Sequence, residues 1–188
     1  VTVSVLYWKR LKMAMQPSLM PFVASATCLN EDTVDNLAAV LGGKVGAKGQ
    51  PAMLRSDCDE QLIMHFEFKP NEAAHVSGLT LVAPNGGAAV PKSVQVFINA
   101  RSLTFGSVDN FRPLDTAVLQ WQPSPSDPAQ QVAHVALKKC AAHNAFQVSV
   151  FVPDNTSDGE DDVTVLTGVT LHGEMAKGMG TTALPQKG

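Results

Sequence analysis

Charged residues are scarce in this chain. They make up 16% of its 188 residues, whereas about 25% is usual for soluble domains. Fourteen Lys and Arg stand against 17 Asp and Glu, for a net charge of -3, so the sequence lacks the basic excess that binds nucleic acid or an anionic membrane surface. No apolar run approaches the ~20 residues that cross a bilayer. These absences exclude a transmembrane protein and favour a soluble domain with a sizeable core.

Cysteine is also rare, with three in the chain: Cys28, Cys58 and Cys140. They lie far apart, and the lack of a CxxC pair excludes a dithiol redox motif. A sparse, odd number favours a reducing compartment, in which a buried thiol acts as a small apolar group, and one disulfide plus a free thiol is the alternative. We therefore expect a cytoplasmic protein, with the nucleus and a cytoskeletal assembly as the other locations.

Helical periodicity is confined to one segment, residues 33–41. Asn30 or Thr33 can cap this helix, and the acidic residues before it favour its positive end. Two glycines, Gly42 and Gly43, then end it. The sequence therefore predicts one short helix near the N-terminus.

Neither end of the chain has the pattern of a packed element. Pro17 and Pro21 break the sequence before the helix, and the residues after 174 are rich in Gly, Lys and Thr without periodicity. We expect a domain over 18–174 between tails at 1–17 and 175–188, and we interpret a chain that starts with Val1 as part of a longer protein.

Most of the remaining sequence alternates with the period of two that is typical of strands. In 61–69, for example, one face carries Leu62, Met64, Phe66 and Phe68, and the other carries Ile63, His65 and Glu67. We expect further strands at 76–82, 93–99, 117–121, 132–137, 147–152 and 163–172, a turn at 84–87 and a loop at 122–128. Six or more short strands with Gly, Pro and Asn turns between them predict an all-β sandwich or barrel.

Two acidic loops are the densest polar clusters, at 56–61 and 154–162. Their carboxylates could bind Ca²⁺ or act as an acid–base pair, but Asp and Ser side chains that hold backbone N–H groups in a turn are the more frequent reason for such a loop. The second loop fails the EF-hand pattern because Val165 stands where that pattern has Glu. We therefore predict a solvated hairpin loop there and no metal site.

The sequence offers no catalytic motif. Its five histidines stand mostly alone, and Cys140 with His143 has no third group nearby to orient the imidazole. No GxSxG, Walker A or dinucleotide fingerprint occurs. We expect neither an enzyme nor a cofactor.

Several strings in the chain match the pattern of one family. They are Ser-Leu-Met-Pro-Phe at 18–22, Cys-Leu-Asn-Glu at 28–31, Ser-Asp-Cys-Asp-Glu-Gln-Leu at 56–62, Pro-Lys at 91–92, Val-Phe-Ile-Asn at 96–99, Leu-Thr-Phe at 103–105, and the strands at 148–155 and 163–173. With them the chain resembles the PITH domain, the C-terminal module of thioredoxin-like proteins. The resemblance covers roughly 18–174, nearly all of the expected domain.

The resemblance implies a jelly-roll β-sandwich, similar to galactose-binding-like modules and to the DOC-like subunit of the anaphase-promoting complex. It also implies protein binding, specifically docking on the regulatory particle of the 26S proteasome. The thioredoxin CxxC motif is absent, so no reductase activity follows. Thr104 replaces an expected Asp, and loops 42–50 and 122–128 alter surfaces where a partner could sit.

The leading hypothesis is a non-enzymatic protein-interaction module, either on the proteasome or as a structural or adaptor subunit of another large assembly whose neighbours hold its tails. The candidate contact residues come from the acidic loops and the family strings: Asp57, Asp59, Glu60, Lys92, Asn99, Asp154, Asp158 and Glu160. The alternative is a carbohydrate- or Ca²⁺-binding jelly roll, for which Trp121 is the one aromatic candidate near a loop. Redox chemistry at Cys58 ranks third, because Asp57 and Asp59 disfavour its thiolate.

Overall fold

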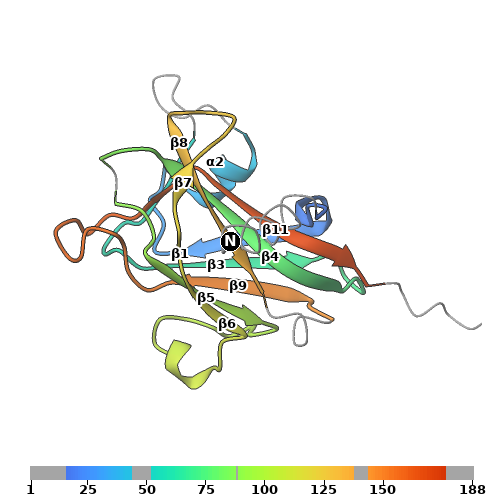
Figure 1. Cartoon of the computed structure of the whole chain (residues 1–188). Helices are drawn as coiled ribbons and strands as arrows, with labels where there is room; N and C mark the ends of the chain where they lie inside the picture. The colour runs from blue at the N-terminus through green and yellow to red at the C-terminus, as the bar shows by residue number, and fades with distance from the viewer. Residues whose placement is uncertain (1–15, 44–51, 88, 138–143, 177–188) are drawn as a thin grey trace, which may run out of the picture.

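Two antiparallel sheets pack face to face in the computed structural model (Figure 1), which describes residues 16–43, 52–87, 89–137 and 144–176. The first has the strand order β1-β3-β9-β5-β6, from Val23–Leu29, Leu62–Phe68, Gln147–Val152, Ser93–Ile98 and Asp115–Val118. The second has the order β11-β4-β8-β7, from Gly168–Met175, Ala74–Pro84, Gln130–Ala136 and Gln122–Pro123. A short pair, β10 (Val165–Leu166) with β2 (Leu54–Arg55), lies beside them. The predicted all-β sandwich is confirmed.

The core lies between the sheets and follows the alternation in the sequence. Leu62, Met64 and Phe66 of β3 face inward and are fully buried, together with valines of β9 and leucines of β4 and β11. The opposite face of β3 carries Ile63 and His65, as predicted. On that outer face of the five-stranded sheet lies a second apolar cluster, which consists of Ile63, Phe97, Ala100, Leu103 and Phe151.

The helix is shorter than the sequence predicts. α2 spans Leu37–Leu41, and Asn36, not Asn30 or Thr33, caps it by accepting a hydrogen bond from the Ala39 N–H. The residues before it form a turn instead, because Asp32 Oδ1 accepts from the N–H groups of Val34 and Asp35. Two 3-10 turns, η1 (Met20–Phe22) and η3 (Val108–Asn110), are the other helical elements among the described residues. None of the described helices is long and apolar enough to cross a membrane.

Several strand boundaries also differ from the prediction. Gln122–Pro123, expected in a loop, pairs with β8 as an edge strand, where proline is tolerated. The segment expected at 163–172 is split into β10 and β11, which belong to different sheets. The loop 154–162 is therefore no hairpin: it carries the chain from β9 of the five-stranded sheet to β10. Residues 1–15 of the predicted tail 1–17 and residues 177–188 of the predicted tail 175–188 lie outside the described residues, whereas β11 itself runs to Met175.

Candidate functional site

Three loops meet at one end of the sandwich. They are 30–36 between β1 and α2, 56–61 between β2 and β3, and 154–164 between β9 and β10. Backbone hydrogen bonds join them directly: the Asp57 N–H donates to Asn30 O at 3.0 Å, and the Ser56 N–H donates to Thr164 O at 3.1 Å. The three loops form one connected surface, although they are far apart in the sequence.

Asn30 organises the first two loops. Its backbone has a φ of 64°, in the left-handed region that Asn tolerates better than most residues. From that position its Nδ2 donates to Asp59 Oδ1 at 2.8 Å and Gln61 O at 2.7 Å, and its Oδ1 accepts from the Cys58 N–H at 3.0 Å. One side chain therefore sets the path of the loop that carries Asp57, Asp59 and Glu60.

Ser56 and Thr164 fasten the third loop to the second. Both are buried, and Ser56 Oγ accepts from the Thr164 N–H at 2.9 Å. The Thr164 hydroxyl donates to Glu60 O at 2.6 Å. Because these bonds are shielded from water, they hold the backbone of both loops in fixed register.

The loop 154–164 is also braced from within. Buried Asn155 donates from Nδ2 to Asp161 O at 2.7 Å and accepts from the Ser157 N–H at 2.9 Å. Asp154 Oδ1 accepts from both the N–H and the hydroxyl of Ser93, which ties the loop to β5. The backbone under the carboxylates is therefore extensively hydrogen-bonded.

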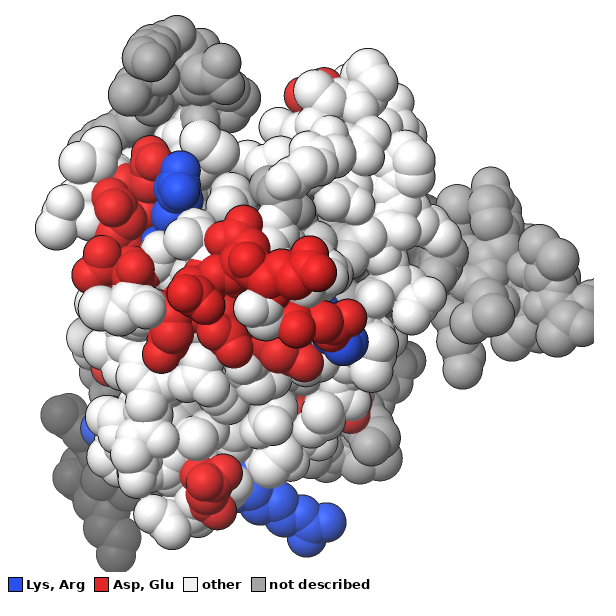
Figure 2. All heavy atoms as spheres, turned by 90° about the vertical axis from the view of Figure 1, so that its left-hand side faces the viewer, with Lys and Arg blue, Asp and Glu red and all other residues white. Residues whose placement is uncertain are grey.

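These loops gather negative charge on one face, as the red surface of Figure 2 shows. We call this surface the acidic end. Among the described residues, Arg55 and Lys92 are the basic residues that adjoin it, and Lys92 pairs with Asp158. The acidic end holds eleven of the 17 acidic residues of the chain: Glu31, Asp32, Asp35, Asp57, Asp59, Glu60, Asp154, Asp158, Glu160, Asp161 and Asp162.

The carboxylates of the acidic end have two kinds of role. Asp59 Oδ1 accepts from the Gln61 N–H, which confirms the turn that sequence reasoning weighed against a metal loop, and Asp154 is used by Ser93. By contrast, Glu60, Glu160 and Asp162 make no side-chain hydrogen bond within the described part of the chain, and Glu160 and Asp162 are exposed. Asp57 is also exposed, and its one side-chain bond comes from the Cys58 thiol. These four carboxylates hold no backbone group and are available to a partner.

The predicted contact residues lie in two separate places, one that includes Lys92 and one that includes Asn99. Lys92 lies at the acidic end, where its hydrogen bond to Asp158 raises the pKa of its ammonium group. Asn99 lies near the start of β9, at the opposite end of the sandwich: its Oδ1 accepts from the N–H groups of Phe146 and Gln147, and its φ is 59°. Seven of the eight predicted contact residues therefore share one surface, and Asn99 shapes a turn elsewhere.

Two other titratable groups of the acidic end also have shifted pKa values. Hydrogen bonds from the Asp35 and Val34 N–H groups lower the pKa of Asp32. The hydrogen bond and the charge of Asp57 raise the pKa of the Cys58 thiol, as sequence reasoning expected. No group of three or more His, Cys, Asp or Glu side chains in the described ranges is placed to hold a metal ion. This surface is therefore suited to attracting cationic groups in solution.

The remaining candidates from the sequence do not assemble elsewhere. Burial strongly raises the pKa of the Cys28 thiol, which is partly buried on β1 beside β3 and packs against the core. Cys140 and His143 lie outside the described residues. The Trp121 indole donates from Nε1 to Pro91 O at 2.8 Å, and its ring packs against the core. The one aromatic candidate for a sugar platform therefore has a structural role.

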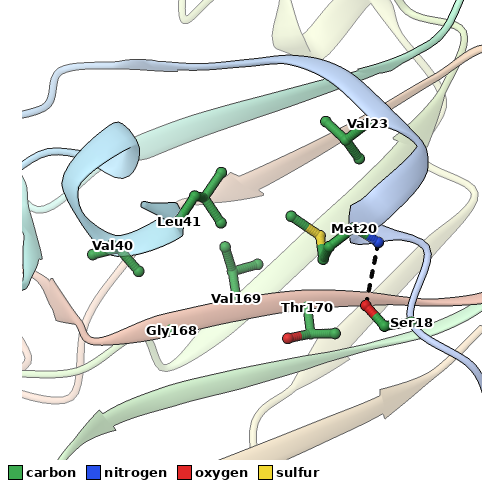
Figure 3. A pocket seen from close by; sticks show the side chains of 8 residues that line it. All are labelled: Ser18, Met20, Val23, Val40, Leu41, Gly168, Val169 and Thr170. Atoms are coloured by element: carbon green, nitrogen blue, oxygen red, sulfur yellow. Dashed lines mark hydrogen bonds between the residues drawn. The ribbon is translucent and has the colours of Figure 1, made fainter. Parts of the chain in front are cut away.

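A separate cavity of about 500 Å³ opens at the side of the sandwich, between η1, α2 and β11 (Figure 3). None of the predicted contact residues lines it. The cavity is lined by five apolar side chains and by three small or polar residues: Met20, Val23, Val40, Leu41, Val169, Ser18, Gly168 and Thr170.

Comparison with known proteins identifies both the family and the fold. The model of the PITH domain matches residues 12–186. Among solved structures, the CBM32-1 and CBM32-2 domains of Clostridium perfringens ZmpB match with a TM-score of 0.56 and 6% identity over 90% of this chain, which spans 39% of that longer chain. CBM32-3 from a family 31 glycoside hydrolase of Clostridium perfringens has a TM-score of 0.56 and 9% identity, with 87% of this chain and 98% of that chain covered. The family 32 module of NanJ from C. perfringens, in complex with galactose, has a TM-score of 0.52 and 7% identity, with 83% and 97% covered. At these identities the likeness concerns the fold alone, a galactose-binding-like jelly roll.

Proposed function

The chain belongs to the PITH domain family, and on that premise we propose that it is a non-enzymatic protein-interaction module that docks through its acidic end on a basic surface of a large assembly. The observation that carries the proposal is the concentration of eleven acidic residues on three loops that are braced by buried hydrogen bonds. A braced surface loses little conformational entropy on binding, so more of its contact energy remains as affinity.

The electrostatics of the acidic end support this role. Outside it, the described chain carries few charges, so a basic partner surface is attracted to one end of the domain in preference to the rest. Interactions between exposed charges reach about 10 Å at 0.1 M salt, and complementary charge mainly speeds association and sets the orientation of docking. We therefore expect binding that is fast and sensitive to salt.

The partner that the family resemblance implies is the regulatory particle of the 26S proteasome, with the cytoplasm or nucleus as the place of action. A pull-down with the purified regulatory particle and immobilised chain at micromolar concentration tests this partner. Retention of the particle is expected. If the particle is not retained, the proteasome is removed as the partner and a subunit role in another assembly takes its place.

Charge-neutralising variants test the contact face. The triple variant Asp57→Asn, Glu160→Gln and Asp162→Asn removes three exposed carboxylates whose side chains brace no backbone. At about 0.5–1 kcal/mol for each exposed charge pair, its affinity should fall tenfold or more. A matched control changes three exposed carboxylates outside the acidic end: Glu67→Gln, Asp109→Asn and Glu174→Gln. Equal losses in both triple variants would contradict docking through the acidic end.

Sugar binding is the rival function, because the fold is shared with modules such as the one solved with galactose. A sugar site in such modules combines an exposed aromatic ring with polar side chains, yet Trp121 packs against the core. In the described chain, the exposed aromatic side chains are those of Phe22 and Phe146. Both lie away from the acidic end. We expect no heat in calorimetric titrations with galactose or Ca²⁺. A saturable heat from either would replace the protein-docking proposal at this end.

A further inference from the structure

The outer face of the four-stranded sheet is an open surface with almost no charge. It carries the side chains that alternate with the buried ones of β11, β4 and β8. Glu174 is the one charged residue of this face within the described chain. The others are Thr170, His172, His75, Ser77, Thr80, Val82, Val132, His134 and Ala136. No described strand or helix packs over this face. A sheet face that belongs to a larger core would normally be covered by a third layer of secondary structure.

A line of hydrogen bonds crosses this face. The Thr80 hydroxyl lies 2.8 Å from His134 Nδ1 and 2.8 Å from His172 Nε2. The imidazole of His172 then reaches Gln16 O through Nδ1, at 3.3 Å. These contacts link β8, β4 and β11 to the first described residue of the chain.

Gln16 directs the N-terminal segment onto this face. Pro17 and Leu19 run along the edge of β11: the Gly173 N–H donates to Pro17 O at 3.1 Å, and the Leu19 N–H donates to Leu171 O at 2.8 Å. At Gln16 the chain leaves the edge, because the Gln16 side chain accepts from the Ser77 hydroxyl on β4, one strand further in. The described part of the chain therefore begins at a point above the sheet and not at its rim.

The sequence of 1–15 matches such a surface. Ten of the 15 residues are apolar, among them Leu6, Tyr7, Trp8 and Leu11, and the charged ones are Lys9, Arg10 and Lys12. An apolar segment of this kind gains by burial, and its positive charges meet no Lys or Arg side chain on the described face. Fifteen residues reach about 50 Å when extended, whereas four strands are only about 15 Å wide.

We propose that residues 1–15 of the same chain are the occupant of this outer face, lying across β11, β4 and β8 as an intrachain cover. The peptide chain joins residues 1–15 to Gln16 and so holds them at a high effective concentration near this face. This favours binding of the chain's own segment over binding of the segment from a second copy of the protein. This inference is independent of the acidic end, which lies on other loops.

The fluorescence of Trp8 tests the proposal in the full chain. The difference between wild type and Trp8→Phe isolates its emission from that of Trp121, and a synthetic peptide of residues 1–15 gives the reference for an exposed indole. We expect Trp8 emission in the chain to be blue-shifted from the peptide and at least several-fold less quenched by acrylamide. Peptide-like emission and quenching would overturn the proposal.

Matched variants locate the contact. The double variant Val132→Lys and Ala136→Lys places two charges on the outer face, and Ala24→Lys with Thr27→Lys places two on exposed positions of β1 in the other sheet. Each is measured against its own Trp8→Phe counterpart, with circular dichroism to show that it is folded. We expect Trp8 to become peptide-like in the first double variant and to stay protected in the second.

Three further outcomes would each contradict the proposal. Protection that persists in the folded outer-face variant would place Trp8 elsewhere. Loss of protection in Leu41→Lys alone would assign Trp8 to the cavity between α2 and β11. Protection that disappears on dilution would make the occupant a second copy of the chain.

Discussion

Replacing Asn30 by glycine tests whether one side chain builds the acidic end. Glycine adopts the φ of 64° without strain, so the change removes the side-chain hydrogen bonds and leaves the backbone path accessible. Asn99→Gly is a matched control, because Asn99 has a φ of 59° and equivalent bonds at the opposite end of the sandwich.

The expected losses of stability are similar for the two variants. The Nδ2 of Asn30 carries two hydrogens and its Oδ1 accepts one bond, so three bonds are lost, and Asn99 also makes three. At about 0.5–1 kcal/mol for each partly exposed bond, the loss is about 2 kcal/mol. The backbone entropy of glycine adds about 0.5–1 kcal/mol. The total of about 3 kcal/mol corresponds to a fall in Tm of roughly 5–12 °C for a domain of this size.

The two variants should differ in binding. Without Asn30, the loop 56–61 must be ordered again on docking, at a cost of about 1 kcal/mol, so the affinity for a basic partner should fall about fivefold. Asn99→Gly should leave the affinity unchanged. Thermal unfolding and a binding titration below both Tm values measure the two effects. A normal Tm for Asn30→Gly would refute the bracing role, and equal affinity losses in the two variants would refute the link between bracing and docking.

Two further predictions concern the sandwich itself. Gly173→Ala should cost about 3 kcal/mol or more in urea unfolding, because the new Cβ would lie 2.1 Å from His75 O at a φ of 154°. A wild-type unfolding midpoint would contradict this close approach of β11 to β4. Burial lowers the pKa values of both His65 and His172 from the usual 6.5, so the unfolded chain binds more protons than the folded chain as pH falls. Their contribution to stability is therefore complete above about pH 6.5 and declines below it. Chemical denaturation from neutral to acidic pH should show this decline, reduced in His65→Gln, and an unchanged slope in that variant would contradict the account.

Much of the fold follows from local patterns. The alternation in β3 predicted which side chains face the core, and it holds from Leu62 to Phe68 because each strand face meets a single environment. Strands β5 and β9 were predicted within a residue of their bounds. Patterns that repeat within one strand carry enough information for such predictions.

Features that depend on distant contacts were missed. The helix begins at Leu37 because Glu31 and Asp32 hold the N–H groups of Leu37, Val34 and Asp35 in a different turn. Edge strands such as β1, with small side chains, and β7, with a proline, give a weak alternating signal.

The candidate site was predicted in composition but not in geometry. Both acidic loops stood out in the sequence, but whether they lie side by side depends on which strands pair. The same strand pairing also brings the loop 30–36 next to them. The organising roles of Asn30, Ser56 and Thr164 could not be derived from the sequence, because their bonds span up to 108 residues. An Asn directly after a strand was the one local signal for Asn30, because a left-handed turn residue often ends a strand.

Hydrogen exchange of the chain with and without the regulatory particle tests the central claim most directly. If the acidic end docks, amides in 30–36, 56–61 and 154–164 should gain protection together, and the gain should weaken as salt is raised. Protection confined to the cavity between α2 and β11, or to the loop around Asn99, with no change in these three loops, would contradict docking through the acidic end.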